Sequence, residues 1–321
     1  VDYSWVHYGG DEFAHTLYTY YWMRYYFEPN QQGVSKMHMM EDIGFDSDLR
    51  KKVRAYLNRP ITGNWTYLDL LFVVGLYHDI GKVREKETGE HHSIAGKYMW
   101  DEFIADELDV PATFEDIVST MFESDIGRRN ITDEFFQTII GDYYGVALLM
   151  QMTDIATHHP TMSVHYAKLA RQSGTFKGDV NAFKKWSMAK KVERLRAFLD
   201  QPMSNPRPKA TQIKWVADYG VEGMSQRLVE EILDPYKGDN ESVYRFGRQH
   251  ASPQAYFYLN SDNFPEIRGM IPDDVTIAGR LIPKTSVIWL HIGETHRQDD
   301  FGEKLAQTIY EALGEILKGI E

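Results

Sequence analysis

The chain has 321 residues, about twice the commonest single-domain length, so two domains are expected. Apolar residues make up 43% and charged residues 26%, proportions typical of folded chains rather than disordered ones. Cysteine is absent, which excludes disulfides, thiolate metal sites and cysteine nucleophiles and is the composition expected of a cytoplasmic protein. No stretch reaches the roughly 20 apolar residues of a membrane span, so no membrane association is expected.

The charge balance is acidic, with 35 Lys and Arg against 47 Asp and Glu and a net charge of −12. Binding of a long nucleic acid needs clustered basic side chains that release counterions from the phosphate backbone. A long nucleic acid is therefore disfavoured as a partner. A small phosphorylated molecule needs only a local basic pocket and stays compatible with this composition.

The first 200 residues predict a helical domain. The spacing of apolar residues predicts helices at 15–27, 35–43, 48–57, 66–77, 93–107, 114–123, 133–140, 145–158 and 180–199. Gly44 is expected to end the second of these helices, and Thr113 to cap the helix that starts at residue 114.

A proline-rich segment separates this domain from a C-terminal region with a different sequence pattern. Residues 200–209 read DQPMSNPRPK, with three prolines in ten positions, which predicts a linker. Beyond it the pattern predicts helices at 225–233 and 300–320 and strands at 255–259, 275–282 and 286–292. The expected fold is mainly α, with a helical domain over residues 1–204 followed by a smaller α+β domain over 205–321. The apolar stripe of the last helix would pack on its own sheet or join a homo-oligomer.

The chemically distinctive segment reads LYHDIGKVREKETGEHHSIAG and contains the string HDIGK. His78 and Asp79 follow an apolar helix and lie about 100° apart on the helical wheel, so an imidazole nitrogen and a carboxylate oxygen can approach one ion. Gly81 would let the backbone pass close to this point. Lys82 carries an ammonium group that could neutralise a phosphate oxygen.

Two residues on other predicted helices complete a set of metal ligands. His38 lies upstream, and Asp154 lies in the apolar run ALLMQMTDIA, where a buried carboxylate must be paired, coordinated or neutralised. Helical bundles build metal sites from ligands on separate helices. The predicted ligands of a divalent ion are His38, His78, Asp79 and Asp154. His15 and His7 are the upstream alternatives to His38.

A His, a His–Asp pair and a distant Asp on a helical bundle resemble the HD-domain metal-dependent phosphohydrolases of the HDIG type. HDIGK matches that motif residue for residue, while HSIAG and TDIATHHP resemble the family's downstream segment and its last ligand helix. The resemblance covers about residues 35–160. It implies a helical HD bundle that hydrolyses a phosphomonoester or phosphodiester, and nucleotides as the substrate class.

The chemistry of the side chains suggests roles for individual residues. A nitrogen and oxygen ligand set accepts Mn, Fe, Zn, Co, Ni or Mg, and the ion would activate a water molecule. Asp79 would hold the ion, Lys82 would offset phosphate charge, and His92 would protonate the leaving oxygen. Arg128 and Arg129 are candidate phosphate contacts, with solvated loop side chains as the alternative.

The chain departs from the family at one position. Relatives with two metals place another His in the helix that here reads VSTMFESDIG, which offers Glu123 and Asp125 instead. One tightly held ion is therefore expected. The alternatives are a di-iron oxygenase on the same bundle, a nuclease acting on single-stranded nucleic acid, and a binding module without activity.

Overall fold

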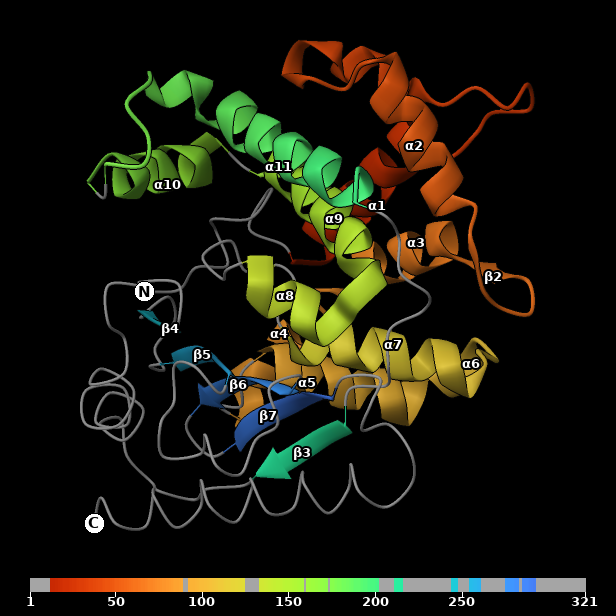
Figure 1. Ribbon diagram of the computed structural model, residues 1–321, viewed down its shortest axis with the longest axis vertical. Coiled ribbons are helices and arrows are strands. Elements are labelled where there is room, and N and C mark those ends of the chain that lie inside the picture. Colours follow the sequence, from red (N-terminus) through yellow and green to blue (C-terminus); the bar gives the residue numbers. More distant parts are fainter. Residues whose placement is uncertain are drawn as a thin grey trace. The chain divides into compact units, whose positions relative to one another are not determined.

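The computed structural model describes residues 12–88, 92–124, 133–158, 160–172 and 174–201, together with five strands between residues 211 and 292 (Figure 1). The chain divides into two compact units, Val1–Arg129 with Tyr143–Met203, and Asn130–Asp142 with Ser204–Glu321. The predicted helix at 133–140 therefore groups with the second unit, although the sequence placed it in the first domain. The predicted helices at 225–233 and 300–320 and most of the predicted linker lie outside the described residues.

The described part of the first unit is mainly α-helical, as the sequence predicts. Its helices are α1 (Glu12–Phe27), the 3-10 helix η3 (Lys36–Ile43), α2 (Ser47–Leu57), α3 (Tyr67–Tyr77), α4 (Lys82–Thr88), α5 (His92–Met99), the π-helix η4 (Trp100–Ile104), α6 (Ala105–Glu107), α7 (Ala112–Glu123), α9 (Tyr144–Thr157), α10 (Pro160–Gln172), the 3-10 helix η6 (Val180–Ala182) and α11 (Phe183–Leu199). A short antiparallel hairpin precedes α3 and consists of β1 (Pro60–Thr62) and β2 (Trp65–Thr66).

Most predicted helices are present, and the differences are local. Gly44 ends η3 with φ of 94°, as expected of a glycine in the left-handed region. The predicted helix at 93–107 is instead divided into α5, η4 and α6. The predicted cap at Thr113 is wrong, because α7 already begins at residue 112 after Pro111, which has no side-chain donor or acceptor to cap it. Helices α4 and α10 were not predicted.

Helices α1, α3 and α9 pack against one another and form the centre of the first unit (Figure 1). A Cβ added at Gly75 would lie 2.1 Å from Sδ of Met23, so the glycine lets α1 approach α3 closely. Between α1 and α9, the hydroxyls of Thr19 and Thr157 are hydrogen-bonded at 3.0 Å. Almost every residue of α9 is buried, as expected for a helix that has neighbours on all sides. This packing brings one end of each helix to a common point.

The turn between α3 and α4 lies against α5 through two glycines. A Cβ at Gly81 would lie 1.8 Å from the carbonyl oxygen of His92 and 2.3 Å from the amide nitrogen of Gly96, both backbone atoms. A Cβ at Gly96 would make only ordinary contacts, the nearest at 3.5 Å. The backbone after the His–Asp pair can therefore touch α5 only because residue 81 has no side chain.

We expect Gly81→Ala to lower the free energy of unfolding by about 3 kcal/mol or more, because a backbone clash cannot be relieved by a rotamer change. Gly96→Ala is the matched control in the same contact and should stay within about 1 kcal/mol of the wild type, helped by the higher helix propensity of alanine. Urea unfolding of both variants measures the difference. Equal stability of the two variants would contradict the close approach at Gly81.

The second unit contains a five-stranded antiparallel sheet with strand order β3-β7-β6-β5-β4. The strands are β3 (Thr211–Trp215), β4 (Tyr244–Gly247), β5 (Gln254–Asn260), β6 (Val275–Ile282) and β7 (Thr285–Ile292). Helix α8 (Asp133–Ile140) packs against β5, β6 and β7 and is followed by the 3-10 helix η5 (Gly141–Tyr143). The three predicted strands correspond to β5, β6 and β7, whereas β3 and β4 were not predicted.

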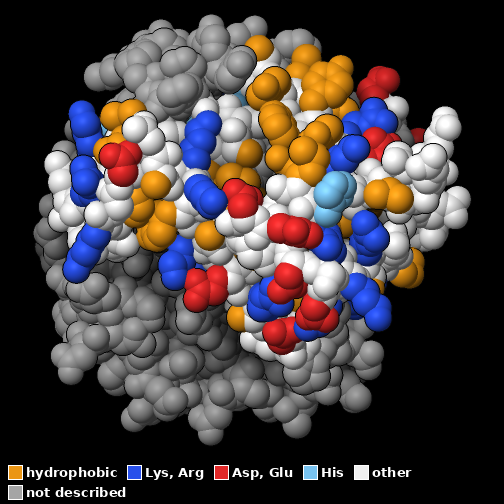
Figure 2. Space-filling view, turned by 90° about the horizontal axis from the view of Figure 1, so that it is seen from above, with side chains coloured by type: hydrophobic (Ala, Val, Ile, Leu, Met, Phe, Trp, Pro, Cys, Tyr) orange, Lys and Arg blue, Asp and Glu red, His pale blue; other side chains and the backbone are white. Residues whose placement is uncertain are grey.

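Surface ion pairs join η3, α2 and α11. Lys185 pairs with Asp42 at 3.0 Å, and Arg196 pairs with Asp46 at 2.8 Å. On the face shown in Figure 2, Asp and Glu side chains lie among the Lys and Arg side chains.

No helix within the described residues is both long and apolar enough to cross a membrane.

Candidate metal centre

Five ionisable side chains from three helices lie close together and form what we call the His/Asp cluster. Nε2 of His15, on α1, lies 3.1 Å from Oδ1 of Asp154 and 3.8 Å from Oδ2 of Asp79. Nε2 of His78, at the end of α3, lies 3.3 Å from the same Oδ2 of Asp79. Nε2 of His158, at the end of α9, lies 3.2 Å from Oδ2 of Asp154. The cluster thus has three imidazoles around two carboxylates.

Three members of the cluster have the geometry of a metal-binding group. One ligand atom from each of His15, His78 and Asp79 can be chosen so that all three atoms lie within 4.8 Å of one another. His15 is fully buried, and Asp79 and Asp154 are only 8% and 6% exposed. Asp154 is outside this three-residue group but adjoins it through His15. Nitrogen and carboxylate donors of this kind suit Mn, Fe or Zn.

The ring of His78 is oriented by the backbone of its own helix. Its Nδ1 lies 3.0 Å from the carbonyl oxygen of Gly75, and since a carbonyl only accepts, Nδ1 carries the proton and donates it. This leaves Nε2 facing the cluster with a lone pair. Nε2 is buried and, among the described residues, makes no hydrogen bond of acceptable geometry. A buried imidazole with one nitrogen fixed by a carbonyl and the other facing carboxylates fits a metal ligand.

The charges around His78 act on its ionisation. Burial disfavours the imidazolium, but the carboxylate of Asp79, through its charge and its direct contact with the ring, acts together with the charge of Asp154 and raises the pKa of His78 above its ordinary value. The positive charge of Lys82 acts in the opposite direction and limits the rise of this pKa. A proton therefore competes with a metal ion for Nε2.

Lys82 and His92, the other predicted catalytic residues, lie on the helices that follow the His–Asp pair. Nζ of Lys82 lies 2.6 Å from Oδ2 of Asp79. His92 is the first residue of α5, and its Nδ1 lies 3.3 Å from Oε2 of Glu85 on α4. The structure places Lys82 directly against a predicted ligand. Its phosphate contact, and the role of His92 as an acid, stay predictions.

The structure does not place His38 in the His/Asp cluster. His38 is exposed on η3, with its Nδ1 3.4 Å from the carbonyl oxygen of Ser35. The buried residues of η3 are Met37, Met40 and Ile43, so His38 faces away from the core. The upstream imidazole of the cluster is that of His15, which was named only as an alternative.

A pattern in the sequence could have identified His15. The residues His15, Thr19, Met23 and Phe27 recur every four positions, and all four are buried along one face of α1. A histidine in register with Met23 and Phe27 belongs to the core face of its helix. The exposed tyrosines of α1 obscured this face in the sequence.

Glu123, at the end of α7, is the residue that the sequence offered as an alternative ligand for a second ion. It is fully buried. Burial disfavours the ammonium of Lys97, but the hydrogen bond to Asp101 and the charge of Glu123 raise the pKa of Lys97 above its ordinary value. Whether Glu123 binds a second ion stays a prediction. The residues Asp125, Arg128, Arg129 and His7 lie outside the described residues.

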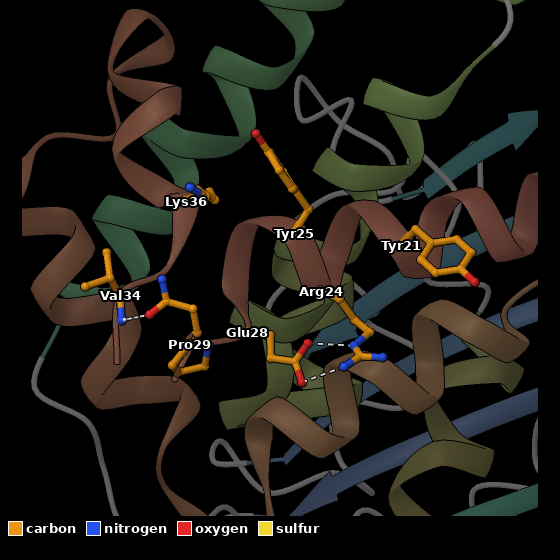
Figure 3. Close-up of a pocket in the computed structure, with 8 residues that line it drawn as sticks. Tyr21, Arg24, Tyr25, Glu28, Pro29, Val34 and Lys36 are labelled. Atoms are coloured by element: carbon orange, nitrogen blue, oxygen red, sulfur yellow. Dashed lines mark hydrogen bonds and ion pairs between the residues drawn. The ribbon is translucent and has the colours of Figure 1, made fainter. Parts of the chain in front are cut away.

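A separate pocket of about 340 Å³ opens along the outer face of α1 (Figure 3). Its lining includes Tyr21, Tyr25 and Lys36, and also Arg24, whose guanidinium donates two hydrogen bonds to Glu28 at 2.6 and 2.8 Å. Because Arg24 is held by this carboxylate, the pocket is a poorer phosphate site than its composition suggests.

The chain gives no significant match to any protein-family model, curated protein or solved structure.

Proposed function

We propose that this chain is a metal-dependent phosphohydrolase of the HD-domain type. It would hydrolyse a phosphomonoester or phosphodiester bond of a small substrate of the nucleotide class, with metal-activated water as the nucleophile. The observation that carries the proposal is the buried group of His15, His78 and Asp79, with Asp154 3.1 Å from His15. Along the chain these four residues follow the order His, His–Asp, Asp, which is the order of ligands in the HD-domain motif that the sequence resembles.

The donor set supports a divalent ion as the cofactor. Two imidazoles and two carboxylates carry two negative charges, which offset the charge of such an ion, and burial strengthens the attraction. His15, His78, Asp79 and Asp154 would hold the ion. When bound, it would polarise a phosphoryl oxygen and activate a water molecule.

The neighbouring side chains would then serve the substrate. The ammonium of Lys82 is 2.6 Å from Asp79, so a phosphate bound beside that carboxylate is within reach of Nζ after a change of rotamer. The contact would offset negative charge on non-bridging oxygens. His92, oriented by Glu85, would donate a proton to the leaving oxygen.

The proposal is tested by removing and restoring the metal. We expect purified full-length protein to release phosphate from at least one member of a nucleotide panel, to lose this turnover on treatment with a chelator, and to recover it when Mn²⁺ is added. Elemental analysis of the same samples reports the metal content. Undiminished turnover in protein shown to be free of metal would contradict the proposal. An iron content with visible colour and no phosphate release would favour the di-iron oxygenase instead.

A further inference from the structure

His158 lies beside the predicted metal ligands, but the proposed function gives it no role. It is the residue that follows α9, one turn beyond Asp154, and it is 4% exposed. Its Nε2 lies 3.2 Å from Oδ2 of Asp154, whereas Nε2 of His15 lies 3.1 Å from Oδ1 of the same carboxylate. The two oxygens of Asp154 are therefore contacted by imidazoles of two different helices. His158 is not a member of the group that His15, His78 and Asp79 form.

We propose that His158 is a positioning residue for the metal centre: it holds Oδ2 of Asp154, so that Oδ1 stays directed toward His15 and the ion. This inference rests on the proposed function, because the positioning role of His158 concerns the same metal ion. A carboxylate attached by a single bond can rotate about that bond. A hydrogen bond to one oxygen fixes the plane of the group and therefore the direction in which the other oxygen points.

The position of His158 is itself fixed from several sides. Its ring stacks on that of Tyr166 of α10, with centroids 5.9 Å apart and an interplanar angle of 26°. Its amide nitrogen lies 3.1 Å from the carbonyl oxygen of Asp154, which continues the helical pattern to the end of α9. The ammonium of Lys184, on α11, donates to the carbonyl oxygens of His158 and Ala156. A side chain held in this way can orient its neighbour.

Tyr166, which stacks on the ring of His158, is itself held by packing. Tyr166 packs against a small core formed by Ala167, Phe176 and Phe183, which joins α10 to the start of α11. Both residues that hold His158 therefore come from elements outside the α1, α3 and α9 contact. Positioning of Asp154 would in this way depend on α10 and α11, which carry none of the predicted ligands.

Titration of full-length protein with Mn²⁺ after chelator treatment tests the inference. His158→Leu removes the donor while it keeps an apolar side chain of similar bulk, and we expect Mn²⁺ affinity to fall by about 10- to 100-fold, the usual effect of losing a partner of a metal ligand. His158→Gln places an amide nitrogen near the position of Nε2 and should retain affinity within about threefold. His38→Ala is the matched control, because His38 is an exposed histidine of η3 outside the His/Asp cluster, and it should bind as the wild type does.

The outcomes separate this inference from the proposed function. Tight binding by wild type together with equal affinity in His158→Leu would overturn the positioning role alone. An equal loss in His158→Gln and His158→Leu would overturn it as well, because shape and not the donor would then matter. Absence of Mn²⁺ binding by wild type would overturn the proposed metal centre, and the role of His158 with it. Melting temperatures of all variants show whether each one is folded before it is titrated.

Discussion

His15→Ala is expected to lose tightly bound metal and nearly all turnover, while His38→Ala keeps both. The reason is the placement of the two imidazoles: His15 is fully buried with its Nε2 3.8 Å from Asp79, and His38 is exposed on η3. Metal content by elemental analysis and phosphate release measure the difference. Asp79→Ala serves as the positive control for loss of a ligand and should match His15→Ala.

A second substitution separates ligation from the structural hydrogen bond of His15. His15→Gln keeps a donor that can reach Oδ1 of Asp154 but supplies a weaker metal ligand, so it should remain folded and still lose the metal. Circular dichroism reports the helical content of each variant. Full metal occupancy in either His15 variant, or loss of metal in His38→Ala, would refute the assignment of His15 as a ligand.

The sequence predicted the parts of the site that depend on local order. The pair His78 and Asp79 lies at the end of an apolar helix, as the pattern indicated, because an N-terminal capping box at Thr66 and Asp69 and the buried leucines of α3 determine that helix from nearby residues. Asp154 also lies on the predicted apolar helix, which is α9. These features follow from the order of residues within a few turns.

The remaining parts depend on tertiary contacts that one sequence marks weakly or not at all. The choice between His15 and His38 is decided by which face of α1 packs on α3 and α9. The four-residue spacing of His15, Thr19, Met23 and Phe27 marks that face, but the tyrosines of α1 obscured it. The approach of Gly81 to the carbonyl of His92 is another such contact. The grouping of α8 with the sheet is a third, because its amphipathic pattern is compatible with any apolar partner.

Lys82→Met is expected to lower turnover by about 10²-fold, the order of one charged donor lost from a transition state, with little change in metal content. A charged ammonium cannot bind the ion, so its removal leaves the ligands in place, and methionine keeps most of the packing of the lysine stem. Nζ of Lys82 is 2.6 Å from Oδ2 of Asp79, a position from which it can reach a phosphate but in which it also pairs with a predicted ligand.

The matched control for this substitution is Lys185→Met, which removes an exposed ion pair with Asp42 on another surface and should change neither turnover nor metal content measurably. If Lys82 only neutralises Asp79, the two variants will turn over substrate at rates within about twofold of each other. In that case Lys82→Met will also bind Mn²⁺ more tightly than the wild type does, because the ammonium that competes with the ion for Asp79 is gone. If Lys82 contacts the phosphate, turnover falls while Mn²⁺ affinity in the absence of substrate does not. Parallel measurement of Mn²⁺ affinity and turnover in the two variants therefore distinguishes a lysine that acts on the substrate from one that acts only on the metal ligand.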